Sequence, residues 1–184
     1  MKRLTFVLLI LGISLIFPTL LLSQETNDHK YSSLENLDYP PSLTELLKKF
    51  EGRVVYIDLM ASWCQPCMME LKESKKLQYY FDEKNIVRLY VTIDNKEDIA
   101  KAFSMIQKDS LNGYFVPYHQ KENLNASSTF PKDIEILFLK DENGKLNISI
   151  PKYAIVNKKG EIVEKRAERP SNFISLKKQL EKYL

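Results

Sequence analysis

The sequence predicts an α/β protein in which helices flank a central mixed β-sheet. Stretches rich in β-branched and apolar residues, at 53–59 and 86–93, alternate with stretches whose apolar residues recur at helical spacing. The last two strand-like stretches flank Lys158-Lys159-Gly160, which is typical of a β-hairpin. With 184 residues and 44% hydrophobic content, the chain can build one domain with a substantial core. Strands that alternate with helices and end in a hairpin favour a mixed sheet between helical layers.

The first residues are typical of an export segment. Lys2 and Arg3 precede residues 4–22, which carry no charge, and the chain becomes polar after residue 23. This order fits a secretory signal peptide, but the apolar run is also long enough to span a bilayer as an uncleaved anchor. Both alternatives place the rest of the chain outside the cytoplasm, in the periplasm. We therefore expect a signal peptide or membrane anchor, a linker and a folded domain over residues 1–23, 24–41 and 42–184.

The folded segment opens with a helix and then alternates between strands and helices. Ser42 and Glu45 form a capping box that starts the first helix, which ends before Gly52. The strand at 53–59 leads into a two-cysteine turn and a helix that runs to about residue 84. After the strand at 86–93, Asp94 or Asn95 is expected to cap an amphipathic helix.

The second half has a less regular pattern. Residues 113–118 predict a short strand, whereas the flanks of the turn within residues 121–149 fit either a strand or a helix. The hairpin strands are expected at 153–157 and 161–165. Ser171 is expected to cap the final helix.

The only two cysteines lie in the stretch Trp63-Cys64-Gln65-Pro66-Cys67. Because a strand precedes them and a helix follows, Cys64 is expected at a helix N-terminus, where free N–H groups and the helix dipole favour an anion. The thiolate is stabilised there, so the pKa of Cys64 can fall below that of an ordinary thiol. Cys67, one turn later and covered by its own helix, can attack a mixed disulfide at Cys64. The pair predicts a dithiol that exchanges electrons with cysteines of another protein.

Other uses of the two cysteines fit less well. A zinc site needs four ligands, and His29 and His119 lie far from the motif in the sequence. Haem attachment needs a histidine directly after the second cysteine, where Met68 stands. A structural disulfide across so short a loop removes little entropy from the unfolded chain and stabilises poorly. We expect no metal and no cofactor.

Charge and compartment narrow the function classes further. The chain has 27 basic and 24 acidic residues, and Lys2 and Arg3 belong to the export segment. The remainder is nearly neutral, which argues against a nucleic-acid partner. Export places the cysteine pair in an oxidising compartment, where a partner must keep it reduced unless it acts as an oxidant.

Four parts of the sequence together resemble one known family. Residues 58–67 match its strand-to-active-site run, Glu70 matches a glutamate common in one branch, and Ile150-Pro151 match its cis-proline position. Residues 153–162 are similar to its last hairpin. The sequence thus resembles the thioredoxin fold over residues 42–184, and more narrowly the exported TlpA/ResA-type thiol-disulfide oxidoreductases. It departs at Tyr90, where many thioredoxins place a buried lysine facing the aspartate.

The resemblance implies roles for two carboxyl groups. Asp58, if buried beneath the cysteines, has a raised pKa and accepts the Cys67 proton. The alternative is a hydrogen-bonded strand aspartate without a proton role. Glu70 tunes the cysteine pair electrostatically or, as the alternative, lies exposed on its helix.

The resemblance also implies a substrate-binding surface. A cis Pro151 lies against the cysteines and leaves the Ile150 backbone free to pair with a substrate strand; the alternative is a trans proline that starts an edge strand. Trp63 shields Cys64 and offers an apolar contact surface, or simply packs in the core.

The expected function is the reduction of disulfides in other exported proteins. Cys64 attacks, a mixed disulfide forms, and Cys67 releases the product. The isoleucine before the proline is also found in reducing thioredoxins, so the resemblance favours reduction over oxidation. The expected partners are disulfide-containing exported clients and an upstream membrane electron donor. The alternative is a periplasmic metallochaperone that binds Cu(I) through the pair and a third soft ligand.

Overall fold

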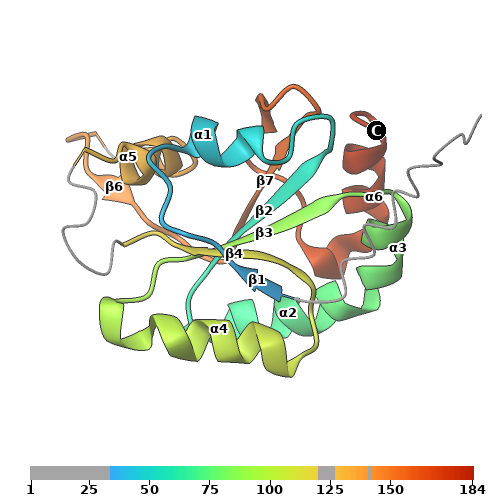
Figure 1. The fold of residues 1–184 in the computed structure, drawn as a ribbon, viewed down its shortest axis with the longest axis horizontal. Helices are drawn as coiled ribbons and strands as arrows, with labels where there is room; N and C mark the ends of the chain where they lie inside the picture. Colours follow the sequence, from blue (N-terminus) through green and yellow to red (C-terminus); the bar gives the residue numbers. More distant parts are fainter. Residues whose placement is uncertain (1–33, 120–126, 141) are drawn as a thin grey trace, which may run out of the picture.

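The computed structural model describes residues 34–119, 127–140 and 142–184, arranged around one six-stranded sheet (Figure 1). Its strand order is β1-β4-β3-β2-β7-β8. The four strands from β1 to β2 are parallel to their neighbours, whereas β7 pairs antiparallel with both β2 and β8. The predicted mixed sheet is therefore confirmed. Its strands are β1 (Leu34–Asn36), β2 (Val55–Met60), β3 (Val87–Thr92), β4 (Gly113–Pro117), β7 (Lys152–Val156) and β8 (Ile162–Glu164).

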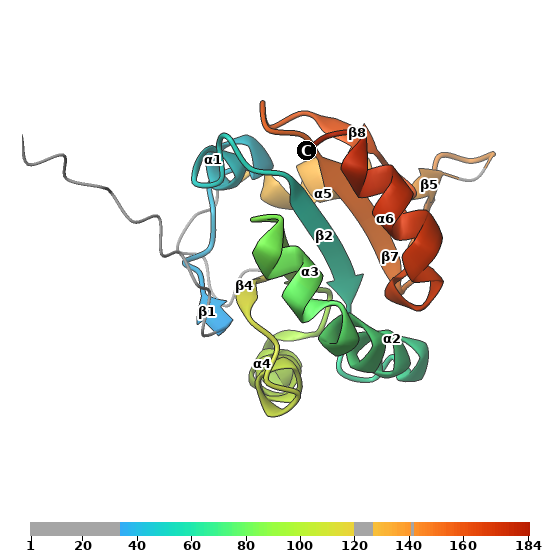
Figure 2. The same cartoon turned by 90° about the vertical axis from the view of Figure 1, so that its right-hand side faces the viewer.

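Helices cover both faces of this sheet. On one face, α1 (Leu43–Lys48) and α5 (Phe130–Glu135) pack on the central strands, and Figure 1 shows both above the sheet. The other face carries α2 (Gln65–Lys76), α3 (Gln78–Glu83), α4 (Ile99–Lys108) and α6 (Phe173–Glu181). Figure 2 shows α3 and α6 beside β2 and β7, whose aromatic residues they bury.

The central strand β2 supplies the side chains that lie beneath the cysteines. All six of its residues are buried, and successive side chains point to opposite faces. Ile57 and Leu59 face α1 and α5, whereas Tyr56 and Met60 face the other layer. Asp58 shares the face of Tyr56 and Met60, so a carboxyl group is buried in an apolar layer.

Local signals set some helix ends and tertiary contacts set others. The Ser42 cap is confirmed, because its Oγ accepts from Glu45 N at 3.0 Å. The cap predicted at Asp94 or Asn95 is wrong: neither side chain caps, and a 3-10 turn, Lys96–Asp98, leads into α4. Asp94 instead accepts from the N–H and the hydroxyl of Ser62, both at 2.7 Å, and so ties the cysteine loop to the end of β3.

Three further segments differ from the prediction or extend it. The single helix expected up to residue 84 is divided at Leu77 into α2 and α3. Within the expected linker, Leu34–Asn36 forms β1, because it finds hydrogen-bond partners along the edge of β4. In the stretch with an open prediction, α5 is followed by a small hairpin of β5 (Leu139–Lys140) and β6 (Leu146–Asn147).

The predicted signal peptide or anchor, residues 1–23, lies outside the described residues. Among the helices of residues 34–119, 127–140 and 142–184, none has the length and apolar character needed to cross a membrane.

Candidate active site

The two cysteines lie where β2 gives way to α2. Cys64 is the N-cap residue of α2, and its Sγ accepts from Cys67 N at 3.2 Å. Pro66 stands in the first helical turn, where its missing N–H costs no helix bond. A disulfide joins Cys64 to Cys67, with the two Cα atoms 5.2 Å apart. The predicted position of the pair at a helix N-terminus is confirmed.

The surroundings of the pair are apolar. Cys64 is 5% exposed and Cys67 1%, and both pack in a cluster with Met60, Leu71 and Tyr90. The Trp63 ring is 60% exposed, so it does not pack in the core. A large apolar side chain directly beside Cys64 is thus presented to solvent.

Asp58 lies in the layer beneath this cluster and is 3% exposed. In the strand register it stands between Tyr90 on β3 and Tyr153 on β7, and directly opposed residues share a face of the sheet. Burial raises the pKa of the Asp58 carboxyl to about 8, and the nearby charge of Glu70 adds to the rise. Within the described residues, Asp58 Oδ1 has no hydrogen-bond partner, which argues against the alternative of a hydrogen-bonded strand aspartate.

The aromatic residues around Asp58 help to explain its raised pKa. Tyr90 opposes Asp58 on β3, so this position supplies a phenol rather than a cation. Burial raises the pKa of Tyr90 to about 12 and that of Tyr153 well above its usual range, so both stay neutral. The Tyr56 ring stacks on Tyr153 with centroids 5.4 Å apart and an interplanar angle of 8°.

Glu70 is buried, contrary to the alternative of an exposed helix glutamate. Its carboxylate accepts from Ser171 N at 2.9 Å and from Ser171 Oγ at 2.8 Å, and Arg169 Nη1 lies 3.7 Å away. The predicted capping role of Ser171 is therefore wrong, because its side chain binds Glu70 while Asn172 occupies the N-cap position of α6. The sequence held no signal for this contact, since the partners are 101 positions apart.

The Ile150-Pro151 peptide bond is cis, as predicted. Ile150 packs against the apolar cluster that contains both cysteines. Lys152 opposes Leu59 near the end of β2, so Pro151 lies at the cysteine end of the sheet. The structure thus brings Cys64, Cys67 and the cis proline to one end of the central strands, with Asp58 below.

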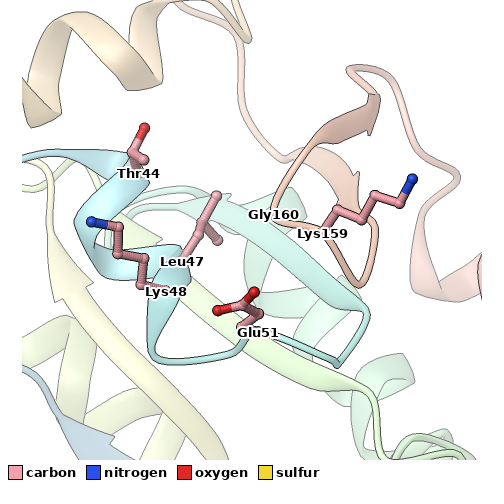
Figure 3. A pocket seen from close by; sticks show the side chains of 6 residues that line it. All are labelled: Thr44, Leu47, Lys48, Glu51, Lys159 and Gly160. Atoms are coloured by element: carbon pink, nitrogen blue, oxygen red, sulfur yellow. The ribbon is translucent and has the colours of Figure 1, made fainter.

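A pocket lies at the end of β7 that is farther from the cysteines. Figure 3 shows its lining residues, which come from the α1 region and the β7–β8 turn: Thr44, Leu47, Lys48, Glu51, Lys159 and Gly160. Lys152 begins β7 beside the cysteines, whereas the turn follows Val156 beside the start of β2. This pocket therefore has no part in the cysteine chemistry.

The described part of the chain holds no group of three or more histidine, cysteine, aspartate or glutamate residues arranged to bind a metal ion.

Comparisons with known proteins agree with this site. The family model described as Redoxin matches residues 25–182. The chain is similar to Thioredoxin 2 of Plasmodium falciparum, with 40% identity over 55 residues, which are 30% of this chain and 34% of that protein. The match thus spans about a third of the curated relative.

Two solved structures from Bacteroides vulgatus, each assigned as a thiol-disulfide oxidoreductase, have similar folds. A solution structure shares 26% identity with a TM-score of 0.50 and covers 74% of this chain and 75% of that one. A crystal structure shares 25% identity with a TM-score of 0.51 and covers 75% and 83%. The predicted thioredoxin-like fold is confirmed.

Proposed function

This chain belongs to the Redoxin family, and we propose that it is an exported thiol-disulfide oxidoreductase that reduces disulfides in other exported proteins. The observation that carries the proposal is the Cys64–Cys67 bond at the start of α2, beside a cis proline and above a buried carboxyl group. The similar structures from Bacteroides vulgatus, each assigned as a thiol-disulfide oxidoreductase, support the redox part of the proposal.

The reaction transfers two electrons from the reduced pair to the client. The Cys64 thiolate, stabilised at the helix N-terminus, attacks one sulfur of the client disulfide. The attacked sulfur becomes bonded to Cys64, the client disulfide breaks, and the other client sulfur leaves as a thiolate that takes a proton. Cys67 then loses its proton and attacks the Cys64 sulfur. The second client thiolate is released, and the Cys64–Cys67 disulfide is formed.

Asp58 is the base that we assign to the second step. Its carboxyl group belongs to the layer directly beneath the cysteines and has a pKa of about 8, close to that of an ordinary thiol. A base with a pKa near that of the acid can accept a proton and return it without a large free-energy penalty. In its ionised form, Asp58 therefore takes the Cys67 proton during resolution and returns it when the pair is reduced again.

Export and direction rest on the sequence and on family resemblance. The uncharged run at 4–22 after Lys2 and Arg3 supports a secretory signal or an anchor, and hence a periplasmic location. An oxidising compartment requires an electron donor, so a membrane donor is the expected upstream partner. Trp63, exposed beside Cys64, supplies an apolar surface for the client, and the Ile150 backbone supplies the pairing edge.

Insulin reduction in the presence of dithiothreitol tests the proposal. The purified protein is expected to accelerate insulin precipitation, and the Cys64→Ser variant is expected to be inactive. Metal analysis of the same preparation tests the Cu(I) alternative. A stoichiometric metal content without any insulin reduction would replace the reductase with a metallochaperone.

A further inference from the structure

A polar pocket of about 260 Å³ borders the cysteine end of β7. The segment after β8 forms its outer wall, because Ala167 N donates to Tyr153 O at 3.0 Å and holds this segment along β7. The pocket is lined by Pro151, Lys152, Tyr153, Arg166, Ala167, Glu168 and Arg169. It therefore begins at the proline that we place beside the client peptide.

The pocket is lined by three cations, Lys152, Arg166 and Arg169, and by the carboxylate of Glu168. The Glu168 carboxylate accepts from Asn172 Nδ2 at 2.8 Å, so it already has a partner outside the pocket. Arg169 lies 3.7 Å from Glu70, whose carboxylate already accepts two hydrogen bonds from Ser171. Neither Lys152 nor Arg166 makes an ion pair within the described residues.

Lys152 and Arg166 also repel each other. Burial, and then the charge of Arg166, lower the pKa of the half-buried Lys152. Like charges held close together destabilise the free protein, and a bound anion relieves the repulsion. The guanidinium groups add paired donors whose geometry suits a carboxylate.

Glu70 keeps the cationic wall in place. By binding Ser171 it fastens the segment around Arg169 to α2, three residues after Cys67. The wall is thus attached to the helix that carries the redox pair as well as to β7.

We propose that Lys152, Arg166 and Arg169 form a subsite that binds the carboxylate of an acidic side chain next to the disulfide in the client protein. The inference rests on the proposed function and names its preferred substrate. An extended peptide that pairs with Ile150 passes Pro151 and brings a neighbouring side chain to the pocket. Clients with a glutamate or aspartate beside the reacting cysteine are therefore preferred.

Two disulfide peptides that differ only by glutamate or glutamine beside the cysteine test this preference. At low salt, the wild-type protein is expected to reduce the glutamate peptide with a kcat/KM about tenfold higher, as a charge-assisted hydrogen bond implies. The double variant Lys152→Gln/Arg166→Gln loses the preference, so that its kcat/KM values for the two peptides become equal. The matched control Lys159→Gln/Lys182→Gln, which removes two exposed cations elsewhere, keeps the preference. Equal rates of the wild-type protein on the two peptides would overturn the subsite.

A binding measurement separates this inference from the reductase proposal. Fluorescent peptides with serine in place of cysteine are titrated against the oxidised protein. Stronger binding of the glutamate peptide without reduction of either disulfide peptide would support the subsite and refute the reductase. Reduction of both peptides at equal rates with equal binding would support the reductase and refute the subsite. A preference for oxidised glutathione over both peptides would assign the pocket to a small-molecule disulfide and refute a client subsite.

Discussion

Among single residues, Asp58 is the most informative, because its buried environment raises its pKa. It is a carboxyl group flanked by tyrosines on both neighbouring strands. Burial and Glu70 both raise its pKa, and no cation contributes in the opposite direction. The sequence predicted the raised pKa from the resemblance, but only the register shows the two flanking phenols.

Asp58→Asn should change how the stability of the protein depends on pH. The folded protein holds the Asp58 proton up to about pH 8, whereas the unfolded chain releases it near pH ~4. The free energy of unfolding of the wild type therefore falls as the pH rises through this window, by up to about 1.4 kcal/mol per pH unit. The variant lacks this fall and should be the more stable protein at pH 9. Urea unfolding at several pH values measures the free energy of unfolding of both proteins. If it changed with pH in the same way for both, the assigned pKa would be contradicted.

The proposed mechanism gives the two cysteines different roles, one in attack and one in resolution. Cys64 caps the helix and is the less covered of the two, so the proposed mechanism assigns the attack to its thiolate. Cys67→Ser should accumulate mixed disulfides with clients, because nothing remains to release them, whereas Cys64→Ser should accumulate none. Non-reducing gels of the two variants check this. Faster alkylation of Cys67 than of Cys64 at neutral pH would reverse the assignment.

At the scale of elements, α2 is linked to the segment before α6 through Glu70. This contact replaces the predicted cap at Ser171, just as the Asp94 bonds to Ser62 replace the predicted cap of α4. Ser42, whose cap was predicted correctly, bonds three residues away in the sequence. Short polar side chains predict a cap reliably only when no buried partner from a distant segment competes for them.

Glu70→Gln should lower the pKa of Asp58, since the Glu70 charge is one of the two causes of its rise. Glu73→Gln, an exposed change on the same helix, should leave that pKa unchanged. Carbon-detected NMR titration of the Asp58 carboxyl in both variants measures the shift. An unchanged titration in the Glu70 variant would show that burial alone raises the pKa.

Ser171→Ala should destabilise the protein by about 1–3 kcal/mol, because it removes one of the two Ser171 hydrogen bonds to the buried Glu70 carboxylate. Thermal or urea unfolding at pH 7 gives the value. Ser104→Ala is the matched control, since its hydroxyl donates to Ala100 O on an exposed helix face. A loss no larger than that of the control would mean that the Glu70 contact adds little stability.

At the scale of the whole molecule, the sequence predicted the layers and the site better than the edges. Alternating strand and helix patterns predicted the mixed sheet, and residues 58–67 predicted the path from β2 to the cysteines. The edge strand β1 was missed because Leu34–Asn36 is short and polar and gains its strand conformation only from β4. The cationic pocket was missed as well, since Lys152 and Arg166 become neighbours only through the β7–β8 turn and the contact of Ala167 with β7.

The central claim is that the Cys64–Cys67 pair gives electrons to clients, and its reduction potential tests that claim most directly. The protein is equilibrated in glutathione and dithiothreitol buffers, and the fraction of free thiols is measured after acid quenching. A reductant is expected near the potential of thioredoxin, about −270 mV, so that glutathione leaves the pair oxidised. A potential near that of a strong oxidant, about −120 mV, would contradict the account, because such a pair takes electrons from its clients.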